Sequence, residues 1–290
     1  MKLNIINACS DLGVNITGAN LGPKEIKKII KDNKNINKII DIECDSSDKS
    51  NDPKDMKKNI VKLNEFNSRL YNAITTLNNI DTLNITVGGD HSIVIASALA
   101  SIKSHEKLGI IWIDTHPDFN TFQTTITGNI HGVPLATVTD NNGYELTLFH
   151  KGNYYKNSNT IILGARDIDP KELENLNRCN IKSYTTKDIK TNLESATLDA
   201  LEKALENTNG IHLSIDLDVL DPNIAPGISV GFNNGLSKEE LFRMLDIILQ
   251  QKEKIKSIDL VEFNPLYDKD NKTLNIAIEV LEKIIDTFKI

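Results

Sequence analysis

The sequence predicts an α/β fold with a mostly parallel sheet that helices cover on both faces. Short apolar runs alternate with segments of helical periodicity along all 290 residues, an order typical of βαβ units. The runs are almost continuously apolar, as expected of parallel strands that are buried on both faces. Acidic residues and histidines follow directly after three of the runs, at the edge where such sheets bind ligands.

Eight apolar runs are predicted to be strands, because each is short, rich in aliphatic residues and bounded by polar or glycine-containing stretches. In chain order they are Leu3–Asn7, Ile39–Ile42, Leu83–Val87, Gly109–Ile113, Thr160–Gly164, Ile181–Tyr184, Ile211–Ile215 and Ile255–Leu260. The segments between and after them carry apolar residues three or four positions apart, which predicts helices. These helices are Lys24–Lys31, Lys57–Asn78, Ile93–Ile102, Pro170–Leu176, Leu193–Asn207, Lys238–Gln251 and Asn275–Thr287.

The organisation of the chain predicts one domain over residues 1–290. There is no internal repeat and no break in composition that would mark a boundary, and α/β folds of this size often form a single unit. The stretch Asp45–Asp55 is polar and charged and includes Pro53. We therefore expect this stretch to be a loop.

Composition excludes several classes of function. The formal charge of −7 and the absence of a basic stripe argue against nucleic acid as a partner. No run approaches the roughly 18 apolar residues of a membrane span, and the amino terminus reads as a strand rather than a signal peptide. The three cysteines, Cys9, Cys44 and Cys179, are widely spaced. They predict reduced thiols in a soluble, cytoplasmic protein.

Two acidic segments follow buried strands and carry the strongest chemical signal. Asp114, His116 and Asp118 occupy alternate positions after one predicted strand, and Asp216 and Asp218 do so after another. In an extended strand, alternate side chains project from the same face. We therefore expect each set to converge on one side of its strand.

Such a cluster predicts a hydrolytic centre with two metal ions, because buried carboxylates repel one another unless cations neutralise them. The alternative is a pair of strand-end loops whose aspartates cap helices. A third segment, Gly88–Ser92, offers His91 after another apolar run. Its alternative role is a tight turn in which Asp90 and Ser92 cap the following helix.

The other histidines differ in what surrounds them. His131 lies between glycines in a predicted loop, where it can shuttle protons near neutral pH. His212 shares a strand face with Asp216, but its distance along the strand predicts a packed histidine rather than a ligand. His105 and His150 have no run of acidic residues around them in the sequence, and we expect them at the surface.

Several motifs together resemble the arginase/agmatinase (ureohydrolase) family across nearly the whole chain. The loop Thr127–Gly132 is more similar to arginase than to agmatinase, and the segments Asp11–Gly13 and Gly18–Pro23 look like the arginase amino terminus. The remaining motifs follow in the family's order: Gly88–Ser92, Asp114–Asn120, Thr127–Pro134, Gly164–Pro170, Asp216–Pro222 and Glu262–Pro265.

The resemblance implies a three-layer α/β/α fold and two Mn²⁺ ions per chain, with Asp114 and Asp216 bridging them. A set of mostly carboxylate oxygens with two imidazoles suits Mn²⁺ better than thiol-seeking metals. The residues implied for one ion are His91, Asp114, Asp118 and Asp216, and those for the other are Asp114, His116, Asp216 and Asp218.

The resemblance also implies catalytic roles for three residues. Asp118 orients a metal-bridging hydroxide, Glu262 pairs with the substrate guanidinium, and His131 relays a proton to the departing amine. A carboxylate suits the planar fork of a guanidinium because it can accept two parallel hydrogen bonds. Without the resemblance, Glu262 reads as a strand-end acid before a turn at Asn264 and Pro265.

Five further residues match family positions that contact the amino-acid end of the substrate. The positions for the α-carboxylate are Asn120, Thr127 and Asn129, and those for the α-amino group are Asp169 and, in an assisting role, Glu172. The neighbouring Arg166 and Asp167 are expected to serve the structure of their own loop.

Two departures from the family pattern concern the substrate rather than the metal ligands. The family commonly has Gly-Thr-Pro where this chain has Ser229-Val230-Gly231, and Val230 offers no hydroxyl group. Ile16 and Thr17 stand where the family has arginines. These departures bear on substrate identity and leave the metal ligands unchanged.

The expected function is manganese-dependent hydrolysis of L-arginine to L-ornithine and urea. One alternative is hydrolysis of another guanidino or formimino compound, such as agmatine, guanidinobutyrate or formiminoglutamate. The other alternative is a catalytically weak relative that binds amino acids. In each case the partner is a small molecule, and the resemblance suggests a homo-oligomer, either a trimer or a hexamer.

Overall fold

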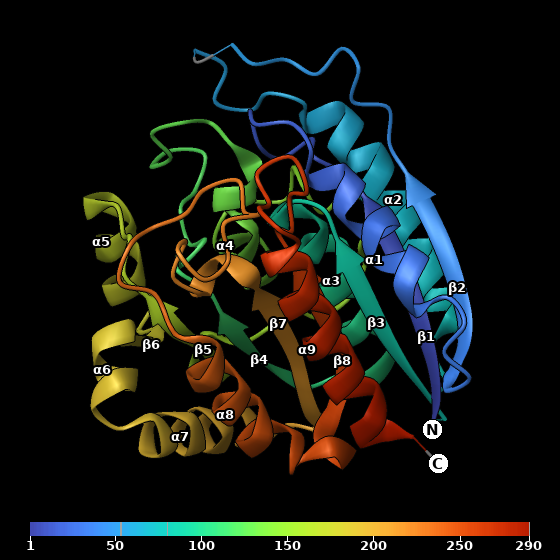
Figure 1. The fold of residues 1–290 in the computed structure, drawn as a ribbon. Helices are drawn as coiled ribbons and strands as arrows, with labels where there is room; N and C mark the ends of the chain where they lie inside the picture. Colours follow the sequence, from blue (N-terminus) through green and yellow to red (C-terminus); the bar gives the residue numbers. More distant parts are fainter. Residues whose placement is uncertain (53, 80, 290) are drawn as a thin grey trace.

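The computed structural model describes residues 1–52, 54–79 and 81–289. Within these residues, eight strands pair in parallel to form one sheet, in the order β2-β1-β3-β8-β7-β4-β5-β6 (Figure 1). The strands are β1 (Lys2–Cys9), β2 (Ile36–Glu43), β3 (Thr82–Gly88), β4 (Leu108–Ile113), β5 (Thr160–Ala165), β6 (Lys182–Thr185), β7 (Gly210–Asp216) and β8 (Ile255–Val261). All eight lie at or near the predicted positions.

The helices alternate with these strands along the chain. Two short helices, α4 (Pro134–Val138) and α6 (Thr186–Thr191), were not predicted. A helix of one or two turns carries too little periodicity to be recognised. The helices are α1 (Gly22–Ile30), α2 (Ile60–Leu77), α3 (Val94–His105), α4 (Pro134–Val138), α5 (Pro170–Arg178), α6 (Thr186–Thr191), α7 (Leu193–Leu205), α8 (Lys238–Leu249) and α9 (Lys272–Phe288).

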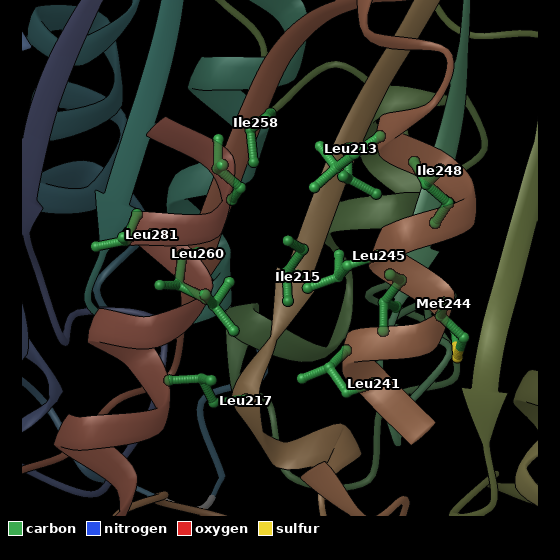
Figure 2. Close-up of a cluster of buried hydrophobic side chains, with 14 of the residues drawn as sticks. Leu213, Ile215, Leu217, Leu241, Met244, Leu245, Ile248, Ile258, Leu260 and Leu281 are labelled. Carbon is green, nitrogen blue, oxygen red and sulfur yellow. The ribbon is translucent and has the colours of Figure 1, made fainter. Parts of the chain in front are cut away.

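Two hydrophobic cores, one on each face of the sheet, make the fold three-layered. One core joins the sheet to α1, α7, α8 and α9, and the other joins it to α2, α3 and α4. Figure 2 shows part of the first core, where Leu213 and Ile215 of β7 face Leu245 and Ile248 of α8. The predicted α/β/α fold is thus confirmed.

The stretch predicted to be a loop, residues 45–55, contains no helix or strand among its described residues, and Pro53 lies outside them. It is nevertheless in contact with the interior, since Lys49 donates hydrogen bonds to the backbone oxygens of Asp11, Val14 and Ile16. No helix in the described part of the chain is both long enough and apolar enough to cross a membrane.

The order of strands in the sheet explains why distant motifs meet. Strands β3, β8, β7 and β4 are consecutive neighbours in the sheet. Their carboxyl ends therefore lie side by side, although the chain visits them in the order β3, β4, β7, β8. The motifs that follow these strands share one edge of the sheet, where parallel sheets bind ligands.

Candidate metal centre

The ends of β3, β4 and β7 bring one histidine against three carboxylates. His91 Nδ1 lies 3.0 Å from Asp114 Oδ2, 3.1 Å from Asp118 Oδ2 and 3.0 Å from Asp216 Oδ2. All four side chains are buried. Among the described residues, His91, Asp114 and Asp216 form one of two groups whose ligand atoms are close enough to hold a metal ion.

The second group lies beside the first and shares Asp114 with it. His116 Nδ1 is 2.9 Å from Asp218 Oδ2 and 3.6 Å from Asp114 Oδ1. Asp114, His116 and Asp218 meet the same criterion for a metal site within the described chain. The six residues predicted as metal ligands therefore lie together. The two groups share Asp114 alone, whereas the predicted sets share Asp216 as well and include Asp118.

The predicted cause of this convergence, alternation of side chains along an extended strand, is wrong for the segment 114–118. Strand β4 ends at Ile113, and the following residues form a loop in which Asp118 has a left-handed φ of 51°. Asp216 ends β7, and Asp218 lies in a 3₁₀ turn whose N-cap is Asp216. Loop and turn geometry, rather than strand alternation, aims these carboxylates at one point.

Residues that the sequence did not single out orient the predicted ligands. Trp112 Nε1 donates a hydrogen bond of 2.8 Å to Asp114 Oδ2, and the Trp112 ring stacks on His91. Ser214 Oγ lies 2.9 Å from His91 Nε2. A polar group on the far nitrogen of a metal-binding histidine fixes the ring and its tautomer. No motif marks Trp112 or Ser214, because each lies within an apolar strand.

His91 provides a test of whether this site fits a cation. When its Nε2–H donates to Ser214, its Nδ1 carries a lone pair. That buried nitrogen makes no hydrogen bond of acceptable geometry with any described residue, although three carboxylate oxygens surround it. Three carboxylate oxygens around one nitrogen repel one another unless a positive charge, either a proton on that nitrogen or a metal ion, lies among them. The arrangement fits a metal ion.

Burial and the proximity of other charges strongly shift the pKa values of the carboxylates. Burial, followed by the charges of Asp218 and Asp114, raises the pKa of Asp216 well above its usual range. Burial and the charge of Asp114 raise the pKa of Asp118 to about 7. Burial also opposes ionisation of Asp114, but its contacts with His116 and His91 outweigh this and lower its pKa. Cations at this site would relieve the repulsion.

Glu262 lies beside the metal-competent groups and holds His131. Its Oε1 accepts a hydrogen bond of 2.9 Å from the backbone N–H of His91 and lies 3.1 Å from His131 Nδ1. Its Oε2 is buried and has no hydrogen-bond partner among the described residues. Glu262 also has a left-handed φ of 67°. Such strain in a residue other than glycine is found preferentially at functional sites.

His131 is paired with Glu262 in the wall of a cavity. Burial alone would lower its pKa, but the hydrogen bond and charge of Glu262 outweigh burial and raise the pKa above its usual value. The backbone N–H of His131 donates to the carbonyl oxygen of Gly13, which fixes the loop that carries it. An imidazole paired with a carboxylate in this way can exchange a proton with a group in the neighbouring cavity.

A cavity of about 200 Å³ lies next to these groups. His116, Asp118, His131 and Val230 contribute to its wall. It is also lined by all five residues predicted to contact the substrate, namely Asn120, Thr127, Asn129, Asp169 and Glu172.

Two of these five residues have a structural role as well. Asp169 is the N-cap of α5 and forms a capping box with Glu172. Asp169 Oδ2 also accepts a hydrogen bond of 3.1 Å from Asn120 Nδ2. Glu172 Oε1 accepts one of 2.8 Å from the backbone N–H of Phe119, and burial raises the pKa of Glu172 to about 8. The start of α5 is thereby joined to the loop that follows β4.

The surroundings of three residues, Asp167, Arg166 and His150, differ from those predicted. Asp167 was expected to serve only its own loop, but it lines the cavity and its Oδ2 lies 3.5 Å from His116 Nε2. Arg166 has a structural role, but in another segment than its own loop: it donates to backbone oxygens after β7, including those of Asp218 and Val219. His150, expected at the surface, is buried against the hydroxyl group of Tyr71.

The remaining two histidines lie away from the cavity. His212 is fully buried, with its Nε2 2.8 Å from Asp259 Oδ2, and is packed as predicted. His105, expected at the surface, is only partly exposed, and its Nε2 is enclosed without a hydrogen-bond partner in the described structure. The absence of acidic runs around a histidine in the sequence does not predict that the histidine is exposed, because its neighbours in space come from other elements.

Comparison with known proteins decides the family. A sequence model described as the arginase family matches residues 1–286. The chain belongs to the arginase family. It is 34% identical over 299 residues to an arginase of Staphylococcus aureus (strain MSSA476), a match that covers 96% of this chain and 95% of that protein. As a member of the arginase family, the protein is an amidinohydrolase, and its two groups can hold metal ions.

Solved structures of this family share the fold. The native arginase structure from Bacillus caldovelox has a TM-score of 0.90 and 29% identity, and the match covers 98% of both chains. The formimidoylglutamase structure from Bacillus subtilis has a TM-score of 0.82 at 22% identity, over all of this chain and 88% of that one. Since proteins named for different substrates share the arginase-family fold, the fold does not select the substrate.

Proposed function

We propose that this protein hydrolyses L-arginine to L-ornithine and urea. The observation that carries the proposal is a single cavity bordered by metal-competent residues and by polar residues suited to an amino acid. His116 and Asp118 line it together with Asn120, Thr127 and Asn129. A substrate with a guanidinium at one end and an α-amino acid at the other matches this division.

We propose that two Mn²⁺ ions complete the site. A donor set dominated by carboxylate oxygens, with two imidazoles, suits Mn²⁺. Two divalent cations supply a strongly acidified water as the nucleophile and neutralise the carboxylates. His91, Asp114, Asp118 and Asp216 would hold one ion, and Asp114, His116, Asp216 and Asp218 would hold the other.

The roles of the catalytic residues follow from their surroundings. Asp118, between the metal-competent groups and the cavity, would accept a hydrogen bond from the attacking water and orient it. Glu262 is not among the residues that line the cavity, but it has one buried carboxylate oxygen without a partner in the described chain, and we assign that oxygen to the guanidinium. His131 shares the other oxygen of Glu262 and would deliver a proton to the departing amine.

We assign the amino-acid end of the substrate to the polar residues of the cavity. Asn120, Thr127 and Asn129 offer hydrogen-bond donors for the α-carboxylate. Asp169 would accept a hydrogen bond from the α-amino group. Glu172 would act indirectly, because its Oε1 is engaged with the backbone of Phe119 and so holds the loop in place.

A second candidate is hydrolysis of a different guanidino or formimino compound. Val230 lines the cavity and offers no hydroxyl group there. A site that lacks one hydrogen-bonding group discriminates less sharply between related substrates. The side chains at this wall are therefore also compatible with agmatine, guanidinobutyrate or formiminoglutamate as the substrate.

A substrate panel tests the proposal. Protein loaded with Mn²⁺ is assayed with L-arginine, agmatine, guanidinobutyrate and formiminoglutamate, with kcat/KM measured for each. We expect L-arginine to be preferred by at least about 100-fold, because the polar end of the site is unsatisfied without its carboxylate and amino groups. A preference for a substrate without the α-carboxylate would overturn the assignment.

We further propose that the protein works in the cytoplasm as a homo-oligomer, a trimer or a hexamer. Free Cys9, Cys44 and Cys179 support a reducing compartment. Light scattering on the purified protein measures its mass in solution. A monomeric mass at micromolar concentration would contradict the proposed assembly.

A further inference from the structure

The loop that carries Thr127, Asn129 and His131 packs against residues 54–59, here termed the covering segment. A Cβ atom placed on Gly128, whose φ is +68°, would lie 2.6 Å from the carbonyl oxygen of Asp55 and 2.8 Å from the Cα atom of Met56. Backbone therefore packs directly on backbone at this point. The covering segment therefore packs on Gly128, which lies between Thr127 and Asn129, two residues predicted to contact the substrate carboxylate.

Lys58 of the covering segment is a buried cation against this loop. Only 3% of the residue is exposed, and its Nζ donates a hydrogen bond of 2.7 Å to the carbonyl oxygen of Thr127. Its neighbours Lys49, Lys57 and Lys62 each pair with an acid. Among the described residues, no carboxylate lies within ion-pair distance of Lys58 Nζ.

A buried ammonium group without a counter-ion is costly, and an anion nearby offsets that cost. The cavity in front of the loop needs such a cation. Its described wall includes four acids, Asp118, Asp167, Asp169 and Glu172, and contains no lysine or arginine. A ligand carboxylate entering this cavity finds no cationic side chain on that wall. The positive charge of Lys58, one backbone group behind Thr127, attracts such a carboxylate in a poorly screening interior.

We propose that Lys58 determines specificity for ligands that carry an α-carboxylate. It acts from behind Thr127 rather than by touching the ligand, and its charge attracts the carboxylate. This inference rests on the proposed function, because it takes the carboxylate to lie against Thr127 and Asn129. Charge, rather than shape alone, is the property that matters.

The test compares ligands with and without the carboxylate on the Mn²⁺-loaded protein. Binding of L-ornithine and of putrescine, its decarboxylated counterpart, is measured by calorimetry, and kcat/KM is measured for L-arginine and agmatine. Lys58→Met is expected to weaken L-ornithine binding and to lower kcat/KM for L-arginine by about tenfold, mainly through KM. Putrescine binding and agmatine turnover are expected to stay within about twofold.

Two further variants separate charge from packing. Lys58→Arg keeps the charge with a different shape, and we expect it to keep the preference for L-ornithine over putrescine even if its Tm falls. Lys57→Met removes the same charge one residue away at a half-exposed position. Since solvent screens such a charge, this control is expected to leave the preference unchanged.

The outcomes distinguish the inference from the proposed function. An equal loss for both classes of ligand in Lys58→Met, or loss of the preference in Lys58→Arg, would overturn the inference and leave the function standing. If the wild-type protein hydrolyses no L-arginine but the Lys58→Met variant loses carboxylate-dependent binding, the proposed function is overturned and the inference stands.

Discussion

Glu262 illustrates how a single residue joins several parts of the site. Its backbone N–H donates to the carbonyl oxygen of Gly89, and its Oε1 meets the backbone of His91 and the ring of His131. Glu262→Gln retains the size of the side chain and an oxygen for those donors, but it removes the negative charge. We expect kcat/KM for L-arginine to fall at least about 100-fold in steady-state assays, with an unchanged metal content by elemental analysis. Near-normal turnover would exclude pairing with the guanidinium.

His131 is predicted to matter for proton transfer and not for metal binding. It lies beside the cavity and contacts Glu262, and neither metal-competent group includes it. His131→Ala should lower kcat by about 10² to 10⁴-fold while both metal ions remain bound. Asp118→Ala, in contrast, should abolish turnover. Metal analysis of the His131 variant is the critical measurement, because loss of an ion there would refute the assigned role.

At the scale of elements, the ends of β1, β3 and β8 are joined at Gly89. An added Cβ atom at Gly89 would lie 1.8 Å from the backbone oxygen of Ser10, so the backbone itself would have to move. Since Glu262 is hydrogen-bonded to Gly89 O, this movement would displace the carboxylate. Gly89→Ala should therefore lower the Tm and reduce kcat/KM by about 100-fold. A stable variant with full activity would show that these strand ends are not rigidly coupled.

Sequence patterns predicted the elements well because the strands between β2 and β6 in the sheet are buried along almost their whole length. The six residues of β4 are all buried, and its sequence is nearly continuously apolar. Helix α6 escaped prediction because it is short. Asp114 and Asp118 were recognised as a pair from their spacing, but their convergence depends on a loop with a left-handed φ at Asp118, a conformation that no spacing rule specifies.

At the scale of the whole molecule, the buried carboxylates predict how stability depends on pH and metal. Asp118 has a pKa of about 7 in the fold, against a usual 3.8. Between these values the metal-free folded chain keeps a proton that the unfolded chain releases, so its free energy of unfolding falls as pH rises from about 4 to 7. His91 and His116, whose pKa values are also raised, add stability at low pH that is lost as pH rises.

Added Mn²⁺ should reverse this trend, because bound cations favour the ionised carboxylates. We expect saturating Mn²⁺ to raise the Tm by at least about 5 °C at pH 7.5, and by less at about pH 5.5. Thermal unfolding with Mn²⁺ and with a chelator measures both values. As a control, metal-free Asp216→Asn should be more stable than the metal-free wild type and should gain less from Mn²⁺. A Tm that does not respond to Mn²⁺ would contradict a metal centre of this kind.

The sequence by itself determined the fold class, the order of the elements and the clusters His91, Asp114–Asp118 and Asp216–Asp218. These follow from local properties, namely runs of apolar residues and the polar residues that end them. Tertiary structure alone decided that Trp112 orients an aspartate and that Lys58 lies behind the cavity. Their roles depend on contacts between segments far apart in the chain, and such contacts leave no local pattern because the order of strands in the sheet differs from their order in the sequence.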